Sequence, residues 1–243
     1  MRLDHATWPE VDSYLSRTGG IILPVGSTEQ HGPMGLIGTD ALCAEAIAMA
    51  AAAQAAAYVA PTLAYTPAPF NTGFPGTVSL SEPVFAEMFT EIVTGLLAQG
   101  FGHVYVLNGH GANLAPMRRV AGDMGAVRIR SWWDFDAVNV IRSAAFGDWE
   151  GMHATPSEIS ITQALYRQIA PGEAELPPRK LSAAEIAERA GDRHGAPDLH
   201  RHEFPDGRVG SHSALATPDL GNRLLIAAAQ SVAADYRMFV QGR

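Results

Sequence analysis

A short apolar run that ends in polar residues constrains this chain more than any other feature. Residues 21–25, IILPV, are apolar and mostly β-branched, which predicts a short buried strand. Gly26 and Ser27 break the run, and Glu29, His31 and Asp40 follow closely. Carboxylate and imidazole side chains at the end of a strand are ligands that Zn²⁺, Mn²⁺ or Fe²⁺ would need. The stretch therefore indicates a metal site at the end of a strand.

Each of the three polar residues also has an ordinary explanation. Glu29 could be solvated, His31 could be a loop histidine, and Asp40 could cap the Ala-rich helix that follows. Taken singly, these explanations are the better ones. The three residues together, directly after a buried strand, favour a site.

Composition restricts the class of protein. A chain of 243 residues can form one large α/β domain or two small ones, and no stretch reads as a linker, so 1–243 is expected to be a single domain. The net charge of −8, without a Lys/Arg run, argues against a nucleic-acid partner. The single cysteine, Cys43, excludes an intrachain disulfide and fits a reducing cytoplasm.

No segment predicts a membrane span or a signal peptide. The first fifteen residues carry charges and lack an apolar core, and the Ala-rich residues 41–57 contain Glu45 and Gln54. We therefore expect a cytoplasmic protein without membrane contact.

Strand-like and helix-like segments alternate along the chain. Strands are expected at 21–25, 58–60, 103–107 and 127–130, and helices at 9–17, 40–57, 82–99, 114–124, 182–189 and 219–239. This alternation predicts a parallel, doubly wound α/β sheet, in which ligands bind beyond the carboxyl ends of the strands. The polar stretches 26–40 and 108–113 both follow strands, whereas 171–180 and 191–218 are expected to be irregular.

Two further segments could supply chemistry. In NGHGAN (108–113) the glycines permit a tight turn and His110 could bind a metal, although Asn-Gly is also an ordinary turn signal. In GMHATPSE (151–158), the spacing from Thr155 to Glu158 predicts a capping box, a structural role for Glu158. The functional alternative makes His153 a general acid or base and Glu158 a metal ligand or second carboxylate.

Other features leave alternatives open. The loop 61–81 is long and rich in Pro and Gly, so it either contributes to a substrate site or is a rigid surface loop. Trp132 and Trp133 could line a pocket, or they could belong to the core or to a subunit interface. A second metal site is one interpretation of the later histidines, and a solvated or packing loop is the better one; these residues are His194, His200, His202 and His212.

Together these motifs resemble the creatininase (creatinine amidohydrolase) family over most of the chain. The matches are GSTEQHGP with Thr39-Asp40, GFPGT at 73–77, NGHGAN, His153 followed by Glu158, and VGSHSALATPDLGNRLLIAA near the C-terminus. The resemblance implies a three-layer α/β/α sandwich with a mostly parallel sheet, assembled as a homo-oligomer, commonly a hexamer. It also implies a hydrolase that cleaves C–N bonds in small-molecule amides: cyclic amides, formamides or small peptide amides.

The resemblance further implies a site with two divalent metal ions per chain, Zn²⁺, Mn²⁺ or Fe²⁺, that share a water as the nucleophile. The matched ligands are Glu29, His31, Asp40 and His110, with Asp40 between the ions, and His153 matches a histidine that transfers protons. Creatininase itself has a metal-binding Glu where this chain has Ala112, so Glu158 is expected to be the fifth ligand. The same departure argues against creatinine as the substrate.

Two other classes of function compete with the hydrolase. A scaffold or regulatory protein could keep the fold without catalysis, but the full set of candidate ligands argues against it. A nucleotide-binding α/β protein is disfavoured because no GxGxxG or GxxxxGK[ST] follows the first strand.

Overall fold

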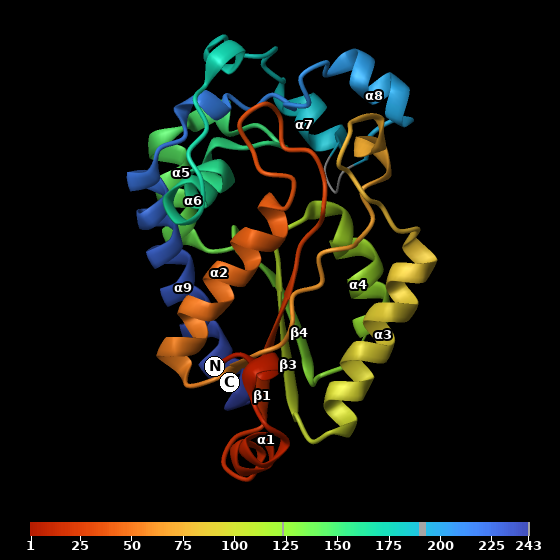
Figure 1. Ribbon diagram of the computed structural model, residues 1–243, viewed down its shortest axis with the longest axis vertical. Helices are drawn as coiled ribbons and strands as arrows, with labels where there is room; N and C mark the ends of the chain where they lie inside the picture. The colour runs from red at the N-terminus through yellow and green to blue at the C-terminus, as the bar shows by residue number, and fades with distance from the viewer. Residues whose placement is uncertain (123, 190–192, 243) are drawn as a thin grey trace.

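The computed structural model describes residues 1–122, 124–189 and 193–242, and the described part contains a four-stranded parallel sheet (Figure 1). The strands are β1 (Gly20–Val25), β2 (Tyr58–Val59), β3 (His103–Asn108) and β4 (Val127–Ser131). Their order across the sheet is β2-β1-β3-β4, and every pairing is parallel. The predicted parallel α/β sheet is therefore confirmed.

Alternating side chains of the strands build a core on each face of the sheet. Ile22, Tyr105 and Leu107 pack toward α2 (Thr39–Ala55), α5 (Asp136–Ala145), α6 (Pro156–Leu165) and α9 (Pro218–Val240). Val104 and Val106 pack on the other face with α1 (Trp8–Leu15), α3 (Glu82–Ala98) and α4 (Leu114–Ala121). Because successive residues of a strand point to opposite faces, these two cores give the three layers seen in Figure 1.

The strand order creates a crevice between β1 and β3. From β1 the chain passes to β2 on one side, and it later returns to β3 on the other side of β1. Connections that leave in opposite directions separate at the carboxyl ends of the two strands, where open α/β sheets bind ligands. In Figure 1, α7 (Ala183–Arg189) and α8 (Pro197–Glu203) lie beyond this end of the sheet.

Two glycines let the backbone close tightly at this end. A Cβ atom on Gly26, just after β1, would lie 2.2 Å from the amide nitrogen of Ala41. A Cβ atom on Gly109, just after β3, would lie 2.4 Å from the carbonyl oxygen of Asp40. Only glycine fits such approaches, so the start of α2 contacts the ends of both strands directly.

The predicted boundaries agree with the structure to within a few residues, and two helices were not predicted. These are α5 and α8, and the expectation that 191–218 is irregular is wrong for Pro197–Glu203. Helix α8 is short, begins with Pro197 and packs against η2 (Pro69–Gly73), so tertiary contact stabilises it more than sequence periodicity does. The other short 3₁₀ helices are Leu3–His5, Gly111–Asn113, Gly147–Glu150, Gly172–Glu175 and Ser213–Leu215.

Membrane-spanning helices were also sought in the described part of the chain. None of its helices combines the length and the apolar character that a bilayer crossing requires.

Candidate metal centre

The structure brings the five predicted ligands together at the crevice. Glu29 and His31 come from the loop after β1, Asp40 from the first turn of α2, His110 from the loop after β3, and Glu158 from the first turn of α6. All five side chains are buried. At this place β1 and β3 end, and α2 and α6 begin. The backbone groups at the ends of strands and helices lack partners within their own element, so polar residues are favoured there.

Asp40 is the centre of this cluster. Its Oδ1 lies 2.9 Å from Nε2 of His31, and its Oδ2 lies 3.0 Å from Nδ1 of His110. The hydroxyl of Ser27 donates a hydrogen bond to Oδ2 at 3.0 Å. Asp40 thus contacts one histidine through each carboxylate oxygen.

The side chains form two groups that could each hold a metal ion. Glu29, Asp40 and His110 make one group, and His31, Asp40 and Glu158 make the other, with the possible ligand atoms of each group within 4.8 Å of one another. Asp40 belongs to both groups. A carboxylate common to two such groups is the arrangement expected for a two-ion centre.

Both ligand histidines have one ring nitrogen facing a carbonyl and the other facing carboxylates. His31 Nδ1 is 3.1 Å from the carbonyl oxygen of Glu29, and His110 Nε2 is 2.8 Å from that of Pro67. Each of these nitrogens carries a hydrogen and donates it, because a carbonyl only accepts. The second nitrogen of each ring faces Asp40, and it can donate a hydrogen to that carboxylate or, once deprotonated, present its lone pair to a metal ion.

The buried negative charges of the cluster also favour the binding of a cation. Burial raises the pKa of Glu158, and Asp40 raises it further, to about 8, although His31 opposes this. Burial lowers the pKa of His31, but Asp40 outweighs it and raises the pKa to about 10. Without a metal, a proton on the imidazole compensates the carboxylates. A divalent ion at the same position would do so in its place.

The buried carboxylate of Glu29 also requires a positive charge beside it. Its Oε1 is buried and lies beside two imidazoles, those of His110, with Nδ1 at 3.1 Å, and His153, with Nδ1 at 3.6 Å. Burial raises the pKa of Glu29, yet His110 and His153 outweigh burial and lower it. Burial of an ionised carboxylate oxygen costs free energy unless a cation binds it.

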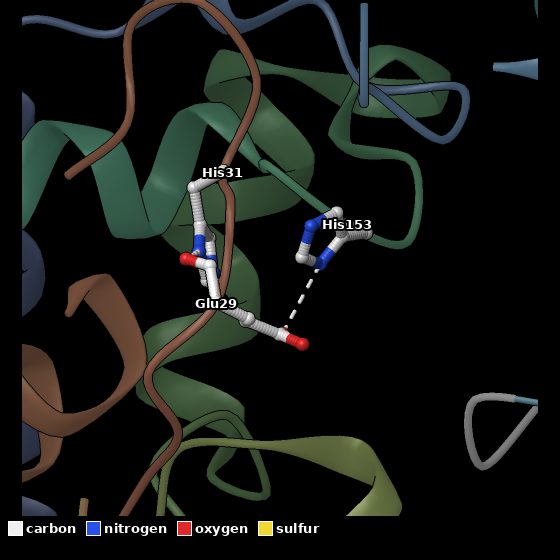
Figure 2. A group of neighbouring side chains, drawn as sticks. All are labelled: Glu29, His31 and His153. Carbon is white, nitrogen blue, oxygen red and sulfur yellow. Dashed lines mark hydrogen bonds and ion pairs between the residues drawn. The ribbon is translucent and has the colours of Figure 1, made fainter. Parts of the chain in front are cut away.

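His153 lies beside Glu29 and His31 (Figure 2). Its hydrogen bonds differ from those of His31 and His110. Its Nε2 donates to the carbonyl oxygen of Gln30 at 2.7 Å, and its Nδ1 lies 3.6 Å from Oε1 of Glu29. Burial, with the nearby His31 cation, lowers the pKa of His153 to about 4. His153 is therefore a neutral base at pH 7, with Nδ1 facing Glu29. Glu29, His31 and His153 also form a third group close enough to hold an ion.

Glu158 has both of the roles that its sequence position allowed. Its Oε1 accepts a hydrogen bond from the Thr155 amide at 2.5 Å, and its own amide donates to Oγ1 of Thr155 at 3.3 Å, which confirms the capping box. The same carboxylate lies 3.9 Å from Nε2 of His31. Ala112, in the 3₁₀ helix after His110, has no side-chain atom that could bind a metal. Glu158 is the carboxylate that completes the group with His31 and Asp40.

Two supporting residues were not identified from the sequence. Asn71 donates to Oε2 of Glu29 at 2.9 Å, and Gln30 donates through Nε2 to Oδ1 of Asn71 at 2.7 Å. The loop 61–81 therefore reaches the cluster, through Asn71 and through the carbonyl of Pro67. The available signals were the length of this loop and the position of Gln30 between two candidate ligands.

A pocket of about 270 Å³ opens onto the cluster. Asp40, His110, His153 and Glu158 line it together with side chains outside the candidate ligand set, which include Trp132, Trp133, Arg142, Met152 and Ile186. Trp132 is also buried in the core and Trp133 packs against it, so both tryptophans take part in the pocket and in core packing.

The four later histidines do not gather into one site. The rings of His194 and His200 lie 4.3 and 5.0 Å from that of Phe70, next to the cluster, and His212 packs on Trp149 at 5.7 Å. His202 is exposed. Within the described ranges, the groups that could hold a metal include none of these four residues.

These features define an α/β/α protein with a candidate two-ion centre at the switch point of its sheet. Comparison with known families is specific: the model for creatinine amidohydrolases, Creatininase, matches residues 4–235. This chain belongs to the creatininase family.

Curated relatives carry different hydrolase names. The chain is 30% identical to the mycofactocin precursor peptide peptidase of Mycolicibacterium smegmatis over 181 residues, which cover 69% of this chain and 70% of that protein. It is 26% identical to the creatinine amidohydrolase of Pseudomonas putida, over 66% of this chain and 70% of that protein. A match of 33% identity to the 3-dehydro-scyllo-inosose hydrolase of Thermotoga maritima covers 43% of this chain and only 34% of that protein.

Solved structures agree on the fold. A crystal structure of creatinine amidohydrolase superimposes with a TM-score of 0.80 at 21% identity, covering 96% of this chain and 95% of that one. A structure described as creatininase Mn gives a TM-score of 0.78 at 23% identity, with 97% of both chains covered. The predicted three-layer α/β/α sandwich is thereby confirmed.

Proposed function

We propose that this protein is a metal-dependent amidohydrolase that cleaves a C–N amide-type bond in a small molecule. The observation that carries the proposal is Asp40, which belongs to both groups of possible ligands while carbonyl groups orient the two histidines beside it. The names of the relatives, an amidohydrolase and a peptidase among them, support hydrolysis of an amide. The pocket volume of about 270 Å³ supports a small substrate.

The residues divide into two ligand sets in this proposal. Glu29, Asp40 and His110 would hold one divalent ion, and His31, Asp40 and Glu158 the other, as Zn²⁺, Mn²⁺ or Fe²⁺. Bound ions of this kind would supply two effects: they polarise a carbonyl oxygen, and they lower the pKa of a bound water toward neutrality.

His153 would move the proton that amide cleavage requires. An amide nitrogen leaves only when it is protonated, so a base that first accepts a proton and then donates it is needed beside the scissile bond. His153 is neutral because burial lowers its pKa, and its Nε2 is committed to the Gln30 carbonyl, so Nδ1 is the atom that accepts the proton. Glu29, 3.6 Å from Nδ1, would stabilise the imidazolium so formed.

Elemental analysis of metal content per chain tests the proposal first. Protein purified without chelator and titrated with Zn²⁺ or Mn²⁺ should bind two equivalents, and Glu158→Gln should reduce that number. One equivalent that does not respond to Glu158→Gln would contradict the two-ion centre. Two bound ions with no hydrolysis of any cyclic amide, formamide or small peptide amide would favour the scaffold alternative.

The role of His153 has its own test. His153→Ala should lower kcat by about 10²–10⁴-fold while the metal content stays the same, because proton transfer is lost and the ligands remain. Loss of metal in this variant would show that His153 is a ligand, as its membership of the third group permits.

The remaining expectations are part of the same proposal. We propose that residues 1–243 act as one domain, since the site draws on segments from Glu29 to Glu158, and that the protein works in the cytoplasm as a homo-oligomer, a hexamer by family resemblance.

A further inference from the structure

Arg142 is a charged side chain of the pocket that the proposed hydrolysis does not use. It comes from α5, and its side chain keeps 20% of its surface accessible while it lines the pocket with Asp40, His153 and Glu158. Among the described residues that line this pocket, it is the only arginine or lysine. Its ion pair with Glu150 compensates the charge, so the open question is what its remaining donors bind in the pocket.

The guanidinium group of Arg142 is held in a fixed orientation. Its Nε donates to Oε1 of Glu150 at 3.0 Å, and its Nη1 donates to Oδ1 of Asn139 at 2.8 Å. The guanidinium carbon lies 5.7 Å from the ring centre of Trp132. Glu150 in turn accepts a hydrogen bond from Ser157, next to the first turn of α6. An arginine fixed in this way loses little further entropy when it binds a ligand.

One nitrogen of this guanidinium is left for a ligand. The structure gives Nη2 of Arg142 no hydrogen-bond acceptor within residues 1–122, 124–189 and 193–242, whereas Nε donates to Glu150 and Nη1 donates to Asn139. Nη2 carries two N–H donors, and a charged N–H donor makes a short, strong hydrogen bond to a carboxylate oxygen.

We propose that the substrate carries a carboxylate in addition to the amide that is cleaved, and that Arg142 binds this carboxylate. The inference rests on the proposed function, because it places the amide at the metal centre and the carboxylate at Arg142 of the same pocket. N-acyl amino acids and ω-amido acids have this chemistry. The small volume of the pocket keeps the two groups a few bonds apart. Arg142 is then a residue that determines specificity.

Calorimetric titration of the metal-loaded protein tests this inference with a matched pair of ligands, N-acetylglycine and its neutral isostere N-acetylglycinamide. The wild-type protein should bind the acid about 10–100-fold more tightly, as expected for a charge-assisted hydrogen bond. In Arg142→Gln this preference should disappear while binding of the neutral amide is unchanged. Arg142→Lys should give an intermediate preference, since it keeps the charge and loses the planar fork.

The controls separate this inference from the proposed function. Arg119→Gln removes an exposed arginine of α4 and should leave the preference intact. The inference is overturned if wild-type protein shows no preference for the acid, or if acid binding survives Arg142→Gln and disappears when chelator removes the metal. Preference for the acid that is lost in Arg142→Gln, together with no hydrolysis of any cyclic amide, formamide or small peptide amide, would contradict the proposed function and leave the Arg142 site established.

Discussion

Two groups of buried charges in this molecule are built from different partners. Asp235 of α9 accepts a hydrogen bond from the Tyr105 hydroxyl at 2.8 Å and pairs with Arg128 at 3.1 Å and Arg130 at 3.3 Å. One carboxylate there has two permanent cations. The cluster around Asp40 has three carboxylates, and within the described part of the chain the possible cations that pair with them are imidazoles.

The difference shows how to tell a structural group from a functional one. The Asp235 group is compensated by the protein itself, so folding alone accounts for it. Imidazoles are neutral at pH 7 unless their surroundings add a proton, so the carboxylates of the Asp40 cluster are compensated only by protons or by an added cation. Buried charge that the chain does not itself neutralise indicates a ligand.

Asp40→Asn is the substitution with the largest expected effect. It removes the one carboxylate common to both groups, so binding of both ions should fail and kcat/KM should fall by about 10³-fold or more. Elemental analysis and a hydrolysis assay on the same preparation measure this. Full metal content in the variant would contradict the prediction, because the Asp40 cluster would then be no more a metal site than the Asp235 group.

Asp235→Asn is the same chemical change in the other group. The free energy of unfolding should fall by about 1.5–3 kcal/mol, because a charged acceptor of three hydrogen bonds is lost and the two arginines are partly exposed. Denaturant titration measures the loss. Metal content and kcat should not change, and a loss of metal here would mean that the Asp235 group is not purely structural.

Asn71→Ala should give a smaller effect, because it removes a hydrogen bond to a ligand and leaves the ligand in place. Activity or metal affinity should fall by about 10–100-fold, since Oε2 of Glu29 loses its donor. Competition with a calibrated chelator measures the affinity. Asn139→Ala, which removes an amide outside the metal cluster, should leave the metal affinity as it is.

His200 is a buried histidine that forms no ion pair among the described residues. Its substitution should have the smallest of these effects, a change in how stability depends on pH. Neither ring nitrogen has a hydrogen-bond partner among the described residues, and burial, with Arg189, lowers its pKa to about 4. The unfolded chain, with a pKa of about 6.5, then binds the proton more readily, so stability is full above pH 6.5 and is lost as the pH falls toward 4.

Thermal melts of the wild-type protein and of His200→Phe between pH 7 and pH 4 test whether stability falls on acidification because of His200. The wild-type Tm should fall more steeply on acidification than the Tm of the variant. His202→Gln, at an exposed position on the same helix, should follow the wild type. Parallel curves for all three proteins would show that His200 does not contribute to acid sensitivity.

Much of the fold and the ligand set could be predicted because the signals are local. The apolar run before Gly26 predicts β1, and the interval from Thr155 to Glu158 predicts the start of α6, so the candidate ligands could be placed at the ends of elements. Asn71 and Arg142 could not be found in this way. Asn71 meets Glu29 across 42 residues of chain, and the significance of Arg142 depends on which of its donors remain unpaired after folding.

The glycine contacts at the ends of β1 and β3 bear on how this family can diverge. Because a backbone atom, not a side chain, meets Gly26 and Gly109, the spacing between the two loops and the start of α2 does not depend on which residues fill the core. Substitutions that accumulate in the layers change stability, but they leave that spacing in place. Chains with about a fifth of their residues in common can therefore have the same architecture, as the TM-score of 0.80 at 21% identity shows. A side chain at Gly26 or Gly109 would disturb that spacing, so we expect substitutions at these two positions to be poorly tolerated.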